Sequence, residues 1–216
     1  MLKALDKFLG DSLQDAGAFI ARLRHSPRSA LENVSIGVRQ SVYRGKSTGG
    51  RCGIICRSLG VNFYELDAVS GGQGDYFFPF VRVGDGGVGS ALVPLDVPYG
   101  TMVLTNSVNG CAIQVNRRAN GYEFYHDANG SSMTIISGKA PALVSHYDDN
   151  RLYRVAAEHY WQQKDDHLLA AGTMPLYQVF FIRTVEGWLA VQSFTTERRQ
   201  GQKSSSVGSR VLGAFR

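Results

Sequence analysis

Residues 34–83 read VSIGVRQSVYRGKSTGGRCGIICRSLGVNFYELDAVSGGQGDYFFPFVRV, and this stretch decides the fold class. It holds short runs rich in β-branched and aromatic residues, separated by GKSTGG and SGGQGD, which are rich in turn formers. Such spacing is typical of an antiparallel sheet. Nearer the end of the chain, PLYQVFFIR and GWLAVQSFTT flank TVEG and predict a hairpin.

Two segments show helical periodicity instead. In residues 1–30 apolar side chains recur every three or four positions, which predicts a helical segment packed on the sheet. Residues 149–172 begin with capping candidates and end on a glycine, so they predict an internal helix. The polar stretch 198–210 predicts a mobile loop, and the glycine-rich stretch 84–90 predicts a flexible connection because it lacks the Lys-Ser/Thr of a P-loop.

Composition restricts the class of protein. With 216 residues, the chain is long enough to form one domain, 1–216, with a substantial core. The net charge of +5 comes from scattered Lys and Arg, so no nucleic-acid partner is expected. Three cysteines indicate reduced thiols rather than a disulfide framework. The N-terminus lacks the apolar run of a signal peptide, no stretch reaches the length of a membrane span, and we expect a monomer.

Residues 101–130, TMVLTNSVNGCAIQVNRRANGYEFYHDANG, contain the residues that point to a reaction. Two apolar runs are joined by NRRANG, whose Asn-Gly pair is a strong hairpin signal. Cys111 begins the first run, directly after Asn109 and Gly110, and His126 lies near the end of the second. Antiparallel pairing would bring Cys111 and His126 close together.

A cysteine beside a histidine is a candidate nucleophile, because an imidazole can stabilise the thiolate. The thiolate would attack a carboxamide carbon while backbone amides near Asn109 and Gly110 hold the oxyanion. His126 would then protonate the departing ammonia, and water would hydrolyse the thioester. The alternative is that Cys111 and His126 have a purely structural role as buried core residues. The remaining histidines show no metal-ligand spacing, so no metal and no cofactor are expected.

One resemblance favours catalysis. Thr105 lies six positions before Cys111, in a segment that ends in Gly-Cys, and an aromatic residue directly precedes His126. Over residues 101–127 this resembles the catalytic core of the cytotoxic necrotizing factor and Burkholderia lethal factor toxins and, more remotely, the chemoreceptor glutamine deamidases. Those toxins carry Leu-Ser-Gly-Cys where this chain has Val-Asn-Gly-Cys. The resemblance implies an α+β fold, a β-sandwich of mixed, mostly antiparallel sheets flanked by helices, with Thr105 as a third site residue.

It also implies a function: a toxin-like effector that deamidates a specific glutamine of a host protein, either a small GTPase or a translation factor. The same thioester could be resolved by an amine, which would make the protein a transglutaminase. A cysteine protease and a non-catalytic binding module are further alternatives. The effector would be secreted without a cleavable signal peptide and act in the host cytoplasm, whereas the alternative location is the bacterial cytoplasm. Asp67 and Asp127 are possible orienters of His126.

Overall fold

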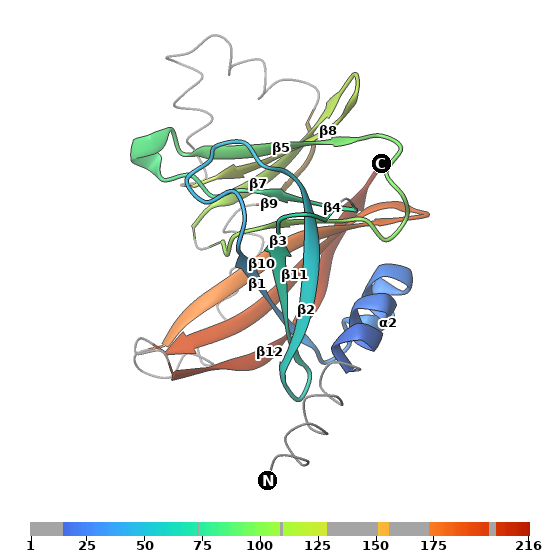
Figure 1. Cartoon of the computed structure of the whole chain (residues 1–216), viewed down its shortest axis with the longest axis vertical. Helices are drawn as coiled ribbons and strands as arrows, with labels where there is room; N and C mark the ends of the chain where they lie inside the picture. The colour runs from blue at the N-terminus through green and yellow to red at the C-terminus, as the bar shows by residue number, and fades with distance from the viewer. Residues whose placement is uncertain (1–14, 73, 109, 129–150, 156–172, 199–201) are drawn as a thin grey trace.

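The computed structural model of the chain describes residues 15–72, 74–108, 110–128, 151–155, 173–198 and 202–216, most of which belong to two sheets (Figure 1). Residues 15–25 are helical. The elements that follow are α2 (Pro27–Ala30), β1 (Ser35–Gln40), β2 (Gly50–Gly60), β3 (Phe63–Val69), β4 (Asp75–Phe78), η1 (Val83–Asp85), β5 (Val88–Pro94), β6 (Met102–Thr105), β7 (Ala112–Arg118), β8 (Gly121–Asp127), β9 (Arg151–Val155), β10 (Thr173–Thr184), β11 (Gly187–Arg198) and β12 (Gln202–Phe215).

The large sheet has the strand order β1-β3-β2-β4-β6-β10-β11-β12. Most neighbours are antiparallel, but β1 runs parallel to β3 and β4 runs parallel to β6, so the sheet is mixed. The small sheet, β5-β8-β7-β9, is antiparallel throughout its described pairs. The hairpin predicted near the end of the chain is confirmed, because β10 and β11 pair along their whole length up to Thr184 and Gly187.

The large sheet curls until its first strand reaches its last two, so it approaches a barrel. The Ile36 amide donates a 2.6 Å hydrogen bond to Ser193 Oγ. Ser35 Oγ donates to the Phe194 carbonyl at 3.2 Å and accepts from the Gly208 amide at 2.7 Å. These bonds satisfy polar groups that the edge of an open sheet would leave without partners.

Alternation along the strands separates two hydrophobic cores. In β10, Phe180 and Ile182 belong to one core, while Val179 and Phe181 belong to the other. The first core packs one face of the large sheet against the helix of residues 15–25, whose Phe19 stacks on Tyr64 with ring centroids 3.8 Å apart. The helix is therefore an integral part of this core.

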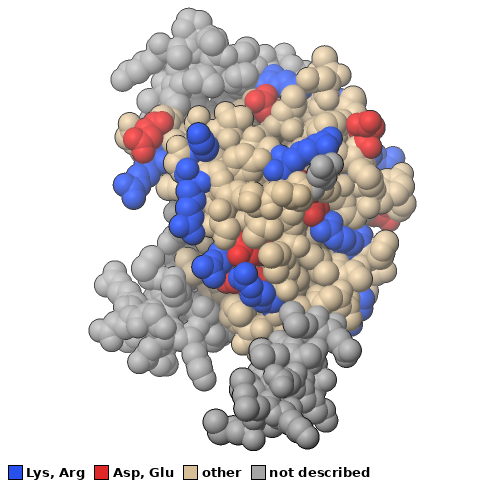
Figure 2. Space-filling model, in the orientation of Figure 1, with Lys and Arg blue, Asp and Glu red and all other residues tan. Residues whose placement is uncertain are grey.

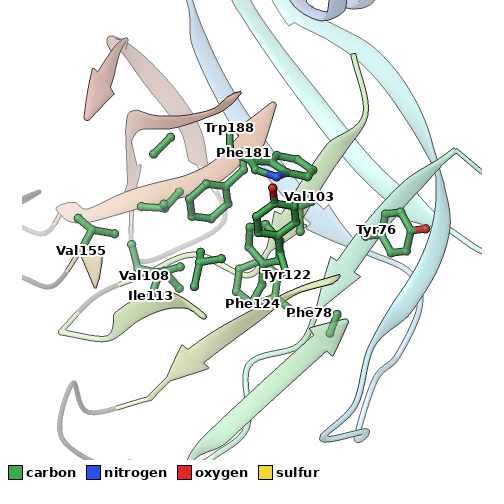
Figure 3. Close-up of a cluster of buried hydrophobic side chains, with 14 of the residues drawn as sticks. Tyr76, Phe78, Val103, Val108, Ile113, Tyr122, Phe124, Val155, Phe181 and Trp188 are labelled. Atoms are coloured by element: carbon green, nitrogen blue, oxygen red, sulfur yellow. The ribbon is translucent and has the colours of Figure 1, made fainter. Parts of the chain in front are cut away.

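The second core fills the space between the two sheets and determines where the candidate site lies. Aromatic rings from the large sheet, Phe181 and Trp188, meet Tyr122 and Phe124 of the small sheet (Figure 3). Burying each such ring stabilises the fold by roughly 1.5–3 kcal/mol. The two sheets are therefore held in a fixed relation, and residues facing inward at the end of this core keep fixed distances from one another.

The structure corrects the expected α+β class. The sandwich of mixed, mostly antiparallel sheets is present, but the described residues are mostly β, and the few helices among them do not flank both sheets. One source of the error is the internal helix predicted for 149–172, because residues 151–155 form β9 on the edge of the small sheet. Tyr153 and Val155, two residues apart, both face the second core, as expected for a strand. In so short a run, the spacing of apolar residues fits the period of a strand as well as that of a helix. Residues 156–172 lie outside the described residues.

The loop predicted for 198–210 is also wrong over most of its length. β11 extends to Arg198 and β12 begins at Gln202, so the small polar residues of this stretch pair with β11. Backbone hydrogen bonds, which the composition does not reveal, hold the strand despite its polar side chains. Of the stretch 84–90, the residues up to Asp85 belong to η1 and those from Val88 onward belong to β5, so Gly86 and Gly87 connect the two elements. Among the described helices, none is both long and apolar enough to cross a bilayer.

Candidate active site

Thr105 and His126 meet at the end of the second core. Thr105 is the last residue of β6 and faces the small sheet, as Val103 does two residues earlier. His126 lies in β8 on the same face as Phe124. The Thr105 hydroxyl oxygen lies 2.8 Å from His126 Nδ1, and both side chains are fully buried. The two residues, 21 apart in sequence, therefore share one hydrogen bond across the two sheets.

The hydroxyl of Thr105 also fixes the tautomer of His126. Thr105 Oγ1 donates a 2.6 Å hydrogen bond to the carbonyl of Phe78, its parallel partner on β4. A hydroxyl has one proton to donate, so Thr105 must accept the second hydrogen bond from Nδ1–H of the imidazole. The lone pair is then on Nε2, which has no hydrogen-bond partner among the described residues. His126 is thus prepared to take a proton at Nε2.

Burial keeps the imidazole neutral. Desolvation lowers the pKa of His126 from 6.5 to about 3. Two aromatic rings contribute to that burial: Phe80 lies edge-on to the imidazole with centroids 5.3 Å apart, and Phe78 lies at 6.4 Å. Phe80 is 40% exposed, so its ring separates His126 from solvent. The resting site holds a neutral base that is screened from water.

This lowered pKa predicts that acid destabilises the fold. Between pH 6.5 and 3 the unfolded chain binds a proton on His126 that the folded chain does not bind, so stability is lost as pH falls through that window. From pH 6 to pH 4 we expect a loss of about 2–3 kcal/mol in the free energy of unfolding from this residue. Urea unfolding at both pH values should show wild type losing that much more than His126→Gln, and equal losses would contradict the pKa.

Cys111 lies on the same side of the small sheet. The β7–β8 hairpin is present, and Ile113 pairs with His126. Cys111 directly precedes β7 and belongs to the same buried core as Ile113, so it lies on the side of the small sheet that carries His126. Cys111 itself is 4% exposed. Directly before it, Gly110 is exposed and has a φ of +83°, a conformation that glycine adopts without strain.

The segment that leads into Cys111 is anchored to the large sheet. Val108 forms an isolated bridge with Tyr177 of β10, and its amide donates to the Tyr177 carbonyl at 2.7 Å. The Gln178 side chain donates to Ser107 Oγ at 2.7 Å. The segment that leads into Cys111 is therefore anchored to β10, and β7 begins directly after Cys111.

A close backbone approach holds the other side of the site. Gly89 of β5 pairs with His126, and a Cβ at this glycine would overlap the Pro79 carbonyl oxygen. Pro79 lies between Phe78, which accepts the Thr105 hydroxyl bond, and Phe80, which covers the imidazole. The absence of a side chain at Gly89 thus lets the 78–80 segment cross the small sheet next to His126.

Among known proteins, this chain shows a weak structural similarity and no match in sequence. No protein-family model matches the chain, and no curated protein matches it. Among solved structures, the chain is similar to the crystal structure of the C-terminal domain of CNFy from Yersinia pseudotuberculosis, with a TM-score of 0.34 and 9% sequence identity. The match covers 68% of this chain and 64% of that one. It is a weak similarity at the level of the fold and assigns no reaction.

The structure does not place the other residues predicted from the sequence around His126. Asn109, proposed with Gly110 for the oxyanion, lies outside the described residues. Asp67 is bonded to Ser41 and Arg57 in the large sheet and does not orient His126. Asp127 is buried and, as the next residue on β8, points to the opposite face from His126. The hydroxyl of Thr105 therefore occupies the orienting position that a carboxylate takes in many triads.

Sequence reasoning missed Phe80 and Gly89. Phe80 follows a proline, and nothing in its own run indicates that its ring lies on a histidine 46 residues later. Gly89 did carry a signal, because a glycine inside a strand pattern often marks a close approach of two backbones. That signal was hidden by the neighbouring glycines, which favoured a flexible connection.

Proposed function

We propose that this chain is a cysteine-dependent glutamine deamidase, with Cys111 as nucleophile, His126 as its base and Thr105 as the residue that positions His126. The observation that carries the proposal is the Thr105 hydroxyl bond, which leaves His126 Nε2 as a buried lone pair on the face that also carries Cys111. The resemblance of these three residues to the glutamine deamidase toxins supports the choice of reaction.

The reaction follows from these roles. His126 Nε2 takes the Cys111 proton, and the sulfur attacks the carboxamide carbon to form a tetrahedral intermediate. Backbone N–H groups near Gly110 stabilise the oxyanion. The C–N bond breaks as His126 returns the proton to the leaving nitrogen, which departs as ammonia and leaves a thioester. Water, deprotonated by His126, attacks the thioester; glutamate forms and Cys111 regains its proton.

The enclosure of the site favours deamidation over proteolysis. Cys111 is 4% exposed and His126 is fully buried, whereas a protease must admit an extended peptide backbone to its nucleophile. A glutamine side chain is slender and needs only a narrow entry. Exposed atoms border the pair at Gly110 and at the Phe80 ring, so the carboxamide would enter between or beside these two residues.

The substrate is proposed to be a host protein of the small GTPase or translation factor class, and the chain to be a secreted effector that acts in the host cytoplasm. The same thioester would give transglutamination if an amine reached it before water. A lysate treated with the protein and a primary amine separates the outcomes by product mass. Glutamate at one glutamine supports deamidation, an amine adduct supports transglutamination, and a cleaved backbone supports proteolysis; no Cys111-dependent change argues for a non-catalytic module.

Replacing Thr105 tests its positioning role. Thr105→Val keeps the shape but removes the hydroxyl, so the buried Phe78 carbonyl and Nδ1–H both lose their partner. Losing one such hydrogen bond costs roughly 1–3 kcal/mol, which corresponds to roughly 5- to 150-fold in kcat if the tautomer is no longer fixed.

The matched control is Thr105→Ser, which retains the hydroxyl and should restore most of the rate. Kinetics with saturating substrate give kcat, and ¹⁵N spectra of the imidazole report the tautomer. A Thr105→Val protein with a wild-type kcat and an unchanged tautomer would rule out the positioning role.

A further inference from the structure

A cavity adjoins Phe80. It measures about 480 Å³ and is lined by Gly45, Lys46, Ser47, Phe80, Val81, Arg82 and Asp85. Its size falls in the range of ligand sites. Phe80 belongs both to the cavity wall and to the cover of His126, since its ring lies edge-on to the imidazole. Whatever occupies the cavity therefore lies one aromatic ring away from the proposed base.

The walls are two turns fixed by backbone hydrogen bonds. In one turn the Lys46 amide donates to the Tyr43 carbonyl at 3.1 Å. In the other the amides of Asp85 and Gly87 both donate to the Arg82 carbonyl at 2.9 Å. Such turns hold the attachment points of their side chains in place before a ligand arrives.

Both turns are also attached to the strands that carry the site. The Ser90 amide of β5 donates to the Ser47 carbonyl at 2.9 Å, and the Ala128 amide at the end of β8 donates to the Gly87 carbonyl at 2.8 Å. The 78–80 segment is fixed as well, because the Phe80 amide donates to Asn106 Oδ1 at 2.8 Å. The cavity and His126 are therefore parts of one connected framework.

The charges of the cavity favour an anionic ligand. Lys46 and Arg82 contribute two positive charges against one negative charge of Asp85, which gives a net charge of +1. Neither cation has an ion-pair partner among the described residues. By contrast, three arginines elsewhere have ion-pair partners within 3.2 Å: Arg24 with Asp75, Arg57 with Glu65 and Asp67, and Arg118 with Glu123. Figure 2 shows Lys and Arg side chains, with some acidic atoms, along the edge where Figure 1 places η1.

We propose that this cavity is a substrate-docking subsite, which binds an acidic segment of the substrate protein next to the glutamine that is deamidated. The inference rests on the proposed function, because that function places a polypeptide at Phe80. Lys46 and Arg82 bind the acidic side chains, while Phe80 contacts the chain between them and the glutamine. A polypeptide is favoured over a nucleic acid because the cavity offers one aromatic ring and two cations, too little for a stacking platform along a phosphate backbone.

Binding of labelled synthetic peptides tests the subsite. The acidic peptide has a central glutamine flanked by Asp and Glu. The control peptide has the same central glutamine with Ser at the flanking positions. In low salt the acidic peptide should bind wild type at least about fivefold more tightly, and Lys46→Glu or Arg82→Glu should each remove most of that difference. Arg28→Glu, an exposed change of equal charge outside the cavity, is the matched control and should retain it.

Several outcomes would overturn the subsite: equal binding of both peptides to wild type, an equal loss in Arg28→Glu, or an oligonucleotide that competes as strongly as the acidic peptide. Ammonia release, measured in parallel, keeps the two proposals apart. Charge-selective binding without ammonia release would refute the deamidase and leave the subsite standing. Equal ammonia release from both peptides would refute the subsite and leave the deamidase standing.

Discussion

Cys111→Ser is expected to lower kcat/KM for glutamine deamidation by about 10⁴-fold or more, since nucleophile replacements in acyl-transfer enzymes have effects of this size or larger. A serine hydroxyl is far harder to deprotonate than a thiol, and His126 is a weak base whose pKa is about 3. The substitution changes one atom at a buried position, so the fold should be preserved. Ammonia release and the conversion of glutamine to glutamate, both measured with the identified substrate, give the rate.

Cys56→Ser is the matched control. Cys56 is half-buried on β2 of the large sheet, where burial raises the pKa of its thiol to about 12, and it lies outside the second core. This variant should keep close to the wild-type rate. Equal activity of wild type and Cys111→Ser, with both proteins folded, would eliminate Cys111 as the nucleophile.

His126→Gln is expected to lower kcat/KM by about 10³-fold, because general-base catalysis contributes 10²–10⁴. Glutamine can still hydrogen-bond to Thr105 Oγ1 but has no basic nitrogen to accept the Cys111 proton. The same variant should slow alkylation of Cys111 by iodoacetamide, which mass spectrometry of the Cys111 peptide measures without any substrate. The two readouts together separate loss of the base from loss of substrate binding.

His25→Gln controls for a histidine change elsewhere, because His25 is exposed at the end of the 15–25 helix. It should affect neither readout. If alkylation of Cys111 proceeds equally fast in wild type and His126→Gln, the imidazole does not activate this thiol, and another base would have to be sought.

Much of the fold was predictable from local pattern. Period-2 runs and turn formers located β1 to β4, and β10 and β11, because strands with one face in a core must alternate. What the pattern could not reveal was pairing between distant segments. β9 and β12 are held by their neighbours β7 and β11 more than by their own composition, so local propensity predicted a helix and a loop there.

For the candidate site, too, the local hairpin was predictable, whereas the contacts between distant segments were not. The Asn-Gly turn signal predicted the β7–β8 hairpin, which has His126 in its second strand and Cys111 directly before its first. The role of Thr105 depends on its parallel partner Phe78, 27 residues earlier, whose carbonyl decides which way the hydroxyl proton points. No local pattern encodes that parallel pairing, and the resemblance to known deamidases marked Thr105 without explaining it.

The anchoring of Val108 to Tyr177 has a consequence for biosynthesis. A nascent chain that ends before β10 already contains Thr105, Cys111 and His126, but it lacks the strand that pairs with β6 and anchors the segment leading to Cys111. Such a chain carries the three site residues without the strand that anchors them. The arrangement of the candidate site is therefore completed only when the C-terminal strands have been translated and folded.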